Sequence, residues 1–329
     1  MLIRFFRSGF FIHHLVIIAT ALLLWLPALI RPSPPIELNC WQPIYDWLKT
    51  LLLPYPLIST VLAFLLMLIS ALYLNKVLAE NGIIGRSATA AAFVFVILTS
   101  WEQQQTMFSP IWIALPLLIY LVSLFFGMYE TNDNESAIFK ATMVVAVLSM
   151  ISFPLIVLWL WVYVALLIMR ISKTNEWIIP LTGLLLPYFL LASYFFLKNK
   201  LLFETQLFTT FIDGLTLGFA VSPKLLPLLI SLLLVVLLIH SMVIVASPVS
   251  DHGIFMRKKK AILNALIFFS IPMLFFEENM WLDFQIIFIP ITSYIGFSWM
   301  LYKRFFWPQL LIILLFGIAV INQYSYLFQ

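Results

Sequence analysis

The sequence predicts an all-α, polytopic transmembrane helical bundle, and three features carry that prediction. Hydrophobic residues make up 64% of the 329 residues and charged residues only 10%, whereas soluble domains contain about 25% charged residues. Apolar stretches of the length that crosses a bilayer, about 20 residues for a helix, recur along the whole chain. Unbroken runs such as 225–246 lack the alternation of a barrel strand, so the spans are expected to be helices.

Eleven apolar stretches, each bounded by charge, proline or asparagine, are expected to cross the membrane. In chain order they are 12–30, 55–74, 87–100, 109–128, 137–152, 154–169, 177–197, 225–246, 261–276, 281–300 and 305–322. No linker or fixed-period repeat divides them, and no polar segment is long enough for a soluble domain. Residues 1–329 are therefore expected to form a single transmembrane domain.

The division of the apolar stretch 137–169 decides the topology. As one helix it would be about 50 Å long at 1.5 Å per residue, too long for one crossing without steep tilt. A hairpin that turns at Ser152, Phe153 and Pro154 fits better, and it leaves 13 of the 18 lysines and arginines inside. The inside set is Arg4, Arg7, Lys76, Arg86, Lys140, Arg170, Lys173, Arg257, Lys258, Lys259, Lys260, Lys303 and Arg304. By the positive-inside tendency, the N-terminus is expected inside and the C-terminus outside.

Two outer segments are expected to carry local structure. Residues 31–54 hold Trp41, Tyr45 and Trp47 between prolines, which predicts a short helix with its aromatic residues at the membrane interface. Residues 198–224 are moderately apolar, and whether they re-enter the membrane stays open.

Acidic residues gather on the outer side of this topology. They are Glu37, Asp46, Glu102, Glu204, Asp213, Glu277, Glu278 and Asp283. Acids near an interface can hold a divalent cation against a lipid pyrophosphate or act as a general base toward a sugar hydroxyl, although loops also need polar residues simply to be wetted. We select Glu37, Asp46 and Glu102 as candidate catalytic residues or metal ligands. Arg31 and Lys49 are candidate contacts for a lipid phosphate.

The sequence contains few residues that would support other classes of function. Despite the net charge of +4, no basic stripe interleaved with aromatics indicates nucleic acid as a partner. His240 is the ionisable residue nearest the middle of a span, and a structural role is expected for it, which disfavours ion channels and proton-coupled pumps. No nucleotide-binding, serine-hydrolase or zinc motif appears. The basic run 257–260 either attracts anionic lipid headgroups or only sets orientation.

Three stretches carry a resemblance to a known family: the opening Arg-Phe-Phe-Arg, the loop from Leu74-Asn75-Lys76 to Arg86, and the segment from Phe153-Pro154 through Glu176-Trp177, Gly183 and Pro187-Tyr188. Together they cover about a third of the chain. The chain resembles a family of polytopic inner-membrane proteins of Bacteroidota that brings no established activity. Its many spans and short first outer helix are also similar to C-type glycosyltransferases and glycan polymerases. That larger group has a paired acidic motif in the first outer loop, which is reduced here to Glu37 and Asp46.

These patterns predict a multi-pass protein of a bacterial inner membrane, in contact with membrane lipids. The resemblance implies that it handles a polyprenyl-linked glycan at its outer face. Two alternatives stay open: a non-catalytic membrane component that binds other envelope membrane proteins, and a lipid or solute transporter. Because the chain has 31 Phe and 11 Trp but few small residues for close helix contacts, we expect loosely interdigitated spans.

Overall fold

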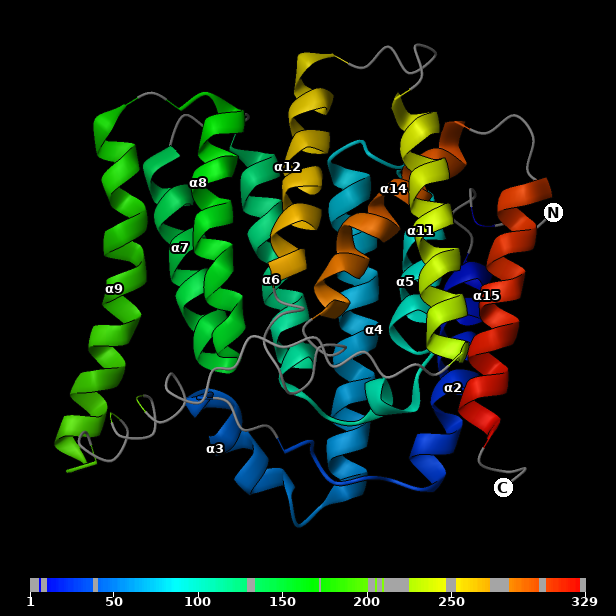
Figure 1. Ribbon diagram of the computed structural model, residues 1–329, viewed down its shortest axis with the longest axis horizontal. Coiled ribbons are helices and arrows are strands. Elements are labelled where there is room, and N and C mark those ends of the chain that lie inside the picture. The colour runs from blue at the N-terminus through cyan, green and yellow to red at the C-terminus, as the bar shows by residue number, and fades with distance from the viewer. Residues whose placement is uncertain are drawn as a thin grey trace.

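A computed structural model describes residues 6, 11–37, 41–128, 134–171, 173–200, 205, 209, 225–246, 253–272, 284–301 and 306–325. Within these residues it contains twelve α-helices, three short 3-10 helices and no strand. The predicted all-α class is confirmed (Figure 1).

Eleven of the described α-helices overlap the eleven predicted apolar stretches, and the twelfth is the short helix predicted within 31–54. In order they are α2 (Phe11–Ile30), α3 (Pro43–Leu52), α4 (Pro56–Glu80), α5 (Ala90–Thr99), α6 (Pro110–Gly127), α7 (Asn134–Ile151), α8 (Leu158–Met169), α9 (Thr174–Leu197), α11 (Leu225–Ala246), α12 (Ile254–Ser270), α14 (Phe288–Leu301) and α15 (Phe306–Tyr324). By length and composition, α2, α4, α6, α7 and α9 can each cross a membrane.

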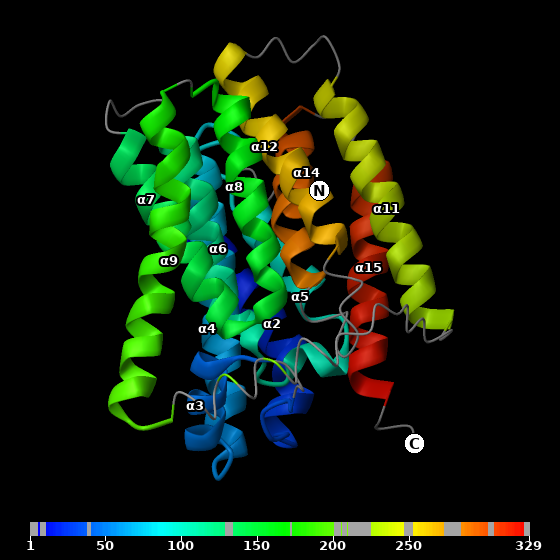
Figure 2. The ribbon, with the colours of Figure 1, turned by 60° about the vertical axis from the view of Figure 1, so that its left-hand side comes forward.

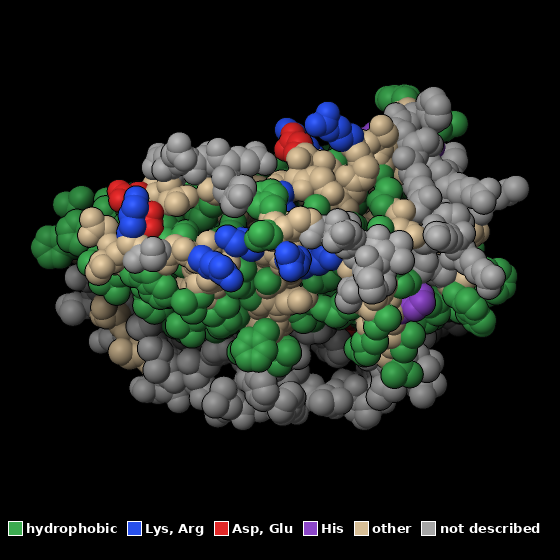
Figure 3. All heavy atoms as spheres, turned by 90° about the horizontal axis from the view of Figure 1, so that it is seen from above, with side chains coloured by type: hydrophobic (Ala, Val, Ile, Leu, Met, Phe, Trp, Pro, Cys, Tyr) green, Lys and Arg blue, Asp and Glu red, His purple; other side chains and the backbone are tan. Residues whose placement is uncertain are grey.

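The helices other than α3 run side by side and alternate in direction, so their ends gather at two opposite ends of the bundle (Figures 1 and 2). We call the upper end in Figure 1, where α4 ends and α12 begins, the basic end, because Lys76, Arg86, Arg170, Lys173 and 257–260 belong to it. Figure 3 looks onto this end and shows lysine and arginine side chains spread across it. The opposite end, which α3 crosses, is the α3 end.

Two helices extend beyond the apolar stretches that predict them. The helix α4 continues to Glu80, where an exposed ion pair joins Lys76 Nζ to Glu80 Oε1 at 3.8 Å, an i,i+4 pair that supports the extra turn. The helix α12 begins at Ile254 and so contains the whole basic run. A prediction from hydropathy ends a span at its first charged residues. The helix itself continues as far as its backbone hydrogen bonds do.

The predicted hairpin at Pro154 is confirmed. The helix α7 ends at Ile151, a 3-10 turn, η2 (Phe153–Val157), follows, and α8 returns beside α7 (Figure 1). Ser152 has an extended backbone with φ −148°, and Pro154 occupies the first turn of η2. Proline has no N–H for the hydrogen bond that would continue α7, which favours a break at this position.

Close helix contacts contradict the expectation of loose packing at two places. A Cβ at Gly296 of α14 would lie 3.4 Å from Ala91 Cβ of α5, a helix in which every residue is buried. A Cβ at Gly183 of α9 would collide with the Thr142 side chain of α7. Small residues therefore do bring backbones together here, as they do in other membrane helix pairs.

Candidate functional site

At the α3 end, one tyrosine joins three segments that lie outside the long helices. The Tyr45 hydroxyl lies 2.8 Å from the Ile36 carbonyl oxygen and 3.1 Å from that of Phe108. The Ile36 N–H donates to the same Phe108 carbonyl at 3.0 Å, and the Tyr45 and Phe108 rings stack at 5.8 Å between centroids. Residues 31–37, α3 and the turn before α6 are thereby held together.

The helix α3 has the residue distribution of a helix that lies in an interface. Tyr45 is fully buried against the bundle, whereas Trp47 is 65% exposed and Leu51 54% exposed. Pro43 begins the helix and needs no hydrogen-bond partner at that position. The short helix predicted within 31–54 is therefore present, with one face on the protein and exposed apolar side chains on the other.

Asp46 is the predicted acid with the most perturbed surroundings. Burial raises the pKa of the Asp46 carboxyl above its usual 3.8, against the opposing effects of Lys49 and of a hydrogen bond from Gln42. Lys49 Nζ lies 3.7 Å from Asp46 Oδ1, and the aspartate side chain is still 47% exposed. A reachable carboxyl with a raised pKa can give and take a proton, which is what general acid–base chemistry needs.

Glu37 lies near the same tyrosine. Burial raises the pKa of the Tyr45 phenol far above its usual value, and the negative charges of Asp46 and Glu37 raise it further, against the hydrogen bond to Ile36. Both predicted acids, nine positions apart in sequence, therefore act on one phenol, and the hydrogen bond from Tyr45 to the carbonyl of Ile36, the residue before Glu37, holds the two segments together.

Glu102, the third predicted acid, has a local role. It is the N-cap of the 3-10 helix η1 (Gln103–Thr106). Its side chain accepts a hydrogen bond from the Gln105 backbone N–H, and the Gln105 side chain accepts one from the Glu102 backbone N–H. This reciprocal arrangement is a capping box. Within the described residues, no three His, Cys, Asp or Glu side chains form a group that can hold a metal ion. Glu37, Asp46 and Glu102 therefore do not form a divalent-cation site by themselves.

The two cations chosen as phosphate contacts differ in position. Arg31 directly follows α2, and its backbone N–H bonds to the Pro27 carbonyl at 3.0 Å. Lys49 has its side chain 20% exposed and is paired with Asp46. A phosphate at Lys49 therefore has to compete with a carboxylate three residues away.

Sequence reasoning did not identify Tyr45 as the common neighbour of the acids, nor a second aromatic contact beside it. The Trp41 ring stacks on Tyr188 of α9 at 6.2 Å between centroids, and the Tyr188 hydroxyl shares a 2.8 Å hydrogen bond with Ser149 of α7. The Pro187-Tyr188 pair therefore lies beside the segment before α3. The only sequence signal was the density of aromatics in 31–54, which does not say what they contact.

A second, buried polar network at the same end joins α2 and α15 to the residues that follow α5. The Trp25 indole N–H of α2 donates to Ser100 Oγ at 2.8 Å, and Gln323 of α15 donates to the Ser100 carbonyl at 2.9 Å. Asn322 donates to the Trp101 carbonyl at 2.8 Å. The bonds from Asn322 and Gln323 satisfy carbonyls directly after α5, so we assign the network to structure.

At the basic end, three consecutive lysines of α12 reach the C-terminal ends of three other helices. Lys258 Nζ donates to the carbonyl of Met169, the last residue of α8, at 3.0 Å. Lys259 Nζ donates at 2.9 Å to both the backbone and side-chain oxygens of Asn81, directly after α4. Lys260 Nζ donates to the carbonyl of Val245 in the last turn of α11 at 2.9 Å. Unpaired C-terminal carbonyls carry partial negative charge, so each ammonium stabilises a helix end.

Comparisons with known protein families, with curated proteins and with solved structures find no match for this chain. The fold defines a class: the described part of the chain is all-helical, and five of its helices are long and apolar enough to cross a membrane. The assignment of function within this class depends on the residues described above.

Proposed function

We propose that this chain is a multi-pass protein of a bacterial inner membrane, with eleven crossings, the N-terminus inside and the C-terminus outside. The alternating course of the eleven helices supports the number of crossings (Figure 1). The distribution of described cations supports the orientation, because Lys76, Arg86, Lys140, Arg170, Lys173 and 257–260 belong to the basic end. Only Arg31, Lys49, Lys198 and Lys200 belong to the α3 end. By the positive-inside tendency, the basic end is cytoplasmic.

At the α3 end, the proposed activity is glycosyl transfer from a lipid-linked saccharide. One observation carries it: Asp46 on α3 is a half-exposed carboxyl with a raised pKa, and its charge and that of Glu37 both act on the Tyr45 phenol. Asp46 takes the proton of an acceptor hydroxyl while the oxygen of that hydroxyl forms a bond to the anomeric carbon of the donor sugar. The bond from that carbon to the lipid phosphate oxygen breaks, and the phosphate leaves with the electron pair.

The other candidate residues have supporting roles in this proposal. Glu37 holds the acceptor hydroxyls by hydrogen bonds, and Arg31 and Lys49 compensate the charge of the leaving phosphate. Glu102 is the weakest catalytic candidate because its side chain caps η1. The resemblance to C-type glycosyltransferases implies the same region, the first outer loop.

The test compares acids at the two ends. Strains carrying Asp46→Asn or Glu37→Gln are expected to accumulate lipid-linked saccharide and to lose the corresponding envelope glycan, both measured by mass spectrometry. Glu80→Gln is the matched control, because Glu80 is 63% exposed and lies at the basic end. Unchanged glycan and unchanged lipid-linked intermediates in both site variants, at normal protein levels, would contradict the proposal.

A second candidate function, a non-catalytic component of an envelope assembly, has support from α9. Only 17% of its spanning window is buried, against 61% for α6. The side chains of Phe189, Tyr194 and Phe196 are each more than half exposed. A photo-crosslinker at Phe189 in native membranes separates the two functions. A specific protein adduct supports the assembly role, and adducts with lipid alone leave α9 as a lipid-facing helix.

Lipid or solute transport is the remaining alternative. In reconstituted vesicles it predicts movement of substrate across the bilayer that does not need Asp46. Glycosyl transfer predicts instead a covalent product that is lost in Asp46→Asn. Analysis of vesicle lipids after incubation with a lipid-linked saccharide distinguishes the two.

A further inference from the structure

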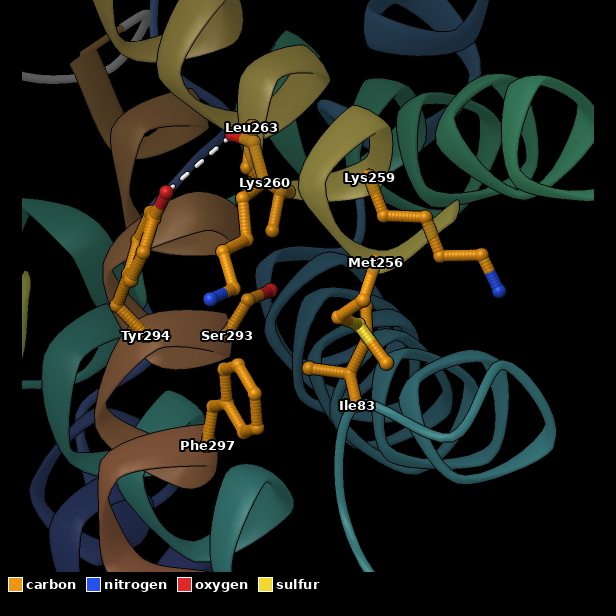
Figure 4. A pocket seen from close by; sticks show the side chains of 8 residues that line it. All are labelled: Ile83, Met256, Lys259, Lys260, Leu263, Ser293, Tyr294 and Phe297. Carbon is orange, nitrogen blue, oxygen red and sulfur yellow. Dashed lines mark hydrogen bonds between the residues drawn. The ribbon is translucent and has the colours of Figure 1, made fainter. Parts of the chain in front are cut away.

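An exposed side-chain amide, that of Asn264, lies on α12 below its basic run. Its contact within the protein is Tyr294 of α14, whose hydroxyl lies 2.6 Å from Asn264 Oδ1. The same hydroxyl lies 3.2 Å from the Lys260 carbonyl of α12, and the dashed line in Figure 4 marks that bond. Tyr294 therefore holds one side of the Asn264 amide against the bundle.

The Asn264 amide has hydrogen-bonding capacity that this contact does not use. Its Nδ2 carries two donors, and its Oδ1 has a second lone pair. Within the described part of the chain, no hydrogen bond is found for Nδ2. The three lysines of the same helix, at 258–260, instead donate to the ends of other helices. Asn264 is thus a polar side chain of α12 that is only partly satisfied.

Asn264 lies along the side of the bundle and not at its end. Its neighbour Tyr294 is about 10 Å from the end of α14, at 1.5 Å per residue. In the proposed eleven-span topology, on which this inference rests, that depth is within the hydrocarbon core. Lipid chains offer no acceptor, and a polar group without a partner in apolar surroundings costs free energy. A protein segment that brings an acceptor would remove this cost.

The surface around Asn264 is apolar and suits contact with another helix. Phe268 follows one turn later and is 66% exposed, and Ile271, directly after α12, is 44% exposed. The spacing of positions 264, 268 and 271 is i, i+4 and i+7, so the three side chains form one stripe. Side-chain packing and hydrogen bonds between amides both associate helices in membranes.

We propose that this stripe is the contact surface of a homodimer, in which the Asn264 amides of two copies bond to each other. An amide is self-complementary, because it carries both donors and an acceptor. Two copies that enter a membrane in the same orientation can be related by a two-fold axis along the membrane normal. Such an axis brings both Asn264 side chains to the same depth. A second copy therefore supplies the acceptor that Nδ2 needs, with no further residue.

Disulfide cross-linking in native membranes tests the contact. In a Cys40→Ser background, Phe268→Cys reports on the stripe, and Leu65→Cys, at a 47% exposed position of α4, is the matched control. Oxidation is expected to give a product of twice the 38.0 kDa chain mass with Phe268→Cys and not with Leu65→Cys. Adding Asn264→Leu should lower the yield about fivefold. Asn264→Gln should retain most of it, because glutamine keeps the amide.

Both changes at position 264 are expected to leave the fold intact. The Tyr294 hydroxyl keeps the Lys260 carbonyl as its acceptor in each variant, and the amount of monomer on a reducing gel checks that the protein accumulates normally. Full cross-linking of Phe268→Cys in the presence of Asn264→Leu would overturn the proposal, as would equal cross-linking of Leu65→Cys. A product of another mass would identify a different protein as the occupant and would also overturn it.

Absence of any product with Phe268→Cys would overturn the homodimer, and a second measurement then tells whether the topology fails with it. A water-soluble thiol reagent is applied to opened membranes. A cysteine at position 268 that does not react lies in lipid, so the homodimer is wrong and the topology stands. A cysteine there that reacts contradicts the placement of α12 in the membrane.

Discussion

The two ends of the bundle use charge in different ways. At the basic end, Lys259 is 2% exposed, and its ammonium is bonded to both oxygens of Asn81 where α4 ends. At the α3 end, Asp46 is 47% exposed on its side chain and is surrounded by segments that hydrogen bonds join outside the long helices. Charge that is bonded to helix ends serves packing, whereas the charge of Asp46 on α3 remains accessible from outside the bundle.

The largest expected effect is at the basic end. Replacing Lys259 by alanine leaves both Asn81 oxygens without this donor, removes the ammonium that lies over the Phe255 and Phe126 rings, and empties a buried position. We expect a loss of about 3 kcal/mol in the free energy of unfolding, measured by thermal unfolding in detergent. Lys76→Ala is the control, because Lys76 is 67% exposed, and it should change stability by less than about 0.5 kcal/mol. Equal losses of stability in the two variants would contradict the distinction between a buried, hydrogen-bonded lysine and an exposed one.

A smaller effect is expected where Tyr45 joins the irregular segments of the α3 end. Tyr45→Phe keeps the ring stacked on Phe108 and removes the hydroxyl that bonds to Ile36. The expected cost is about 1 kcal/mol, the net contribution of one hydrogen bond, measured under the same conditions. A loss of stability as large as that of Lys259→Ala would show that the contacts of Tyr45 contribute as much to stability as those of Lys259.

The smallest expected effect is on the pH dependence of stability. Because burial raises the pKa of Asp46 above 3.8, the folded protein binds this proton more tightly than the unfolded chain does. The contribution of Asp46 therefore favours folding at low pH and is lost as the pH rises from 3.8 through the raised pKa. Relative to Asp46→Asn, the wild-type melting temperature should fall across that window. A constant difference between the two proteins, or one of opposite slope, would contradict the described surroundings of Asp46.

Hydropathy and charge predicted most of the helices, because apolar length and proline positions are local properties of the chain. The break at Pro154 and the short helix around Tyr45 follow from such local features. The expectation of loose packing was wrong at Gly183 and Gly296, because composition counts small residues without showing which of them face another helix. One glycine opposite Thr142 is enough to bring α7 and α9 together.

The partners of individual side chains were not predictable in the same way. Lys259 and Asn81 are 178 positions apart, and nothing in a run of lysines says which helix end lies beside it. Glu37 and Asp46 were selected among the outer acids, and the structure adds that the charges of both act on the Tyr45 phenol. Glu102 was chosen by the same reasoning, yet its capping box with Gln105 gives it a local structural role. The other predicted outer acids lie outside the described residues: Glu204, Asp213, Glu277, Glu278 and Asp283.

Cysteine labelling tests most directly whether the two ends face opposite sides of a membrane. In a Cys40→Ser background, single cysteines replace Lys198 at the α3 end and Arg86 at the basic end, both exposed positions. On intact cells whose outer membrane is permeable to the reagent, a thiol reagent that does not cross the inner membrane should label position 198 and not position 86. Position 86 should react once the inner membrane is opened. Labelling of both positions on intact cells, or of position 86 alone, would contradict the eleven-span topology and the placement of Asp46 on the outer face.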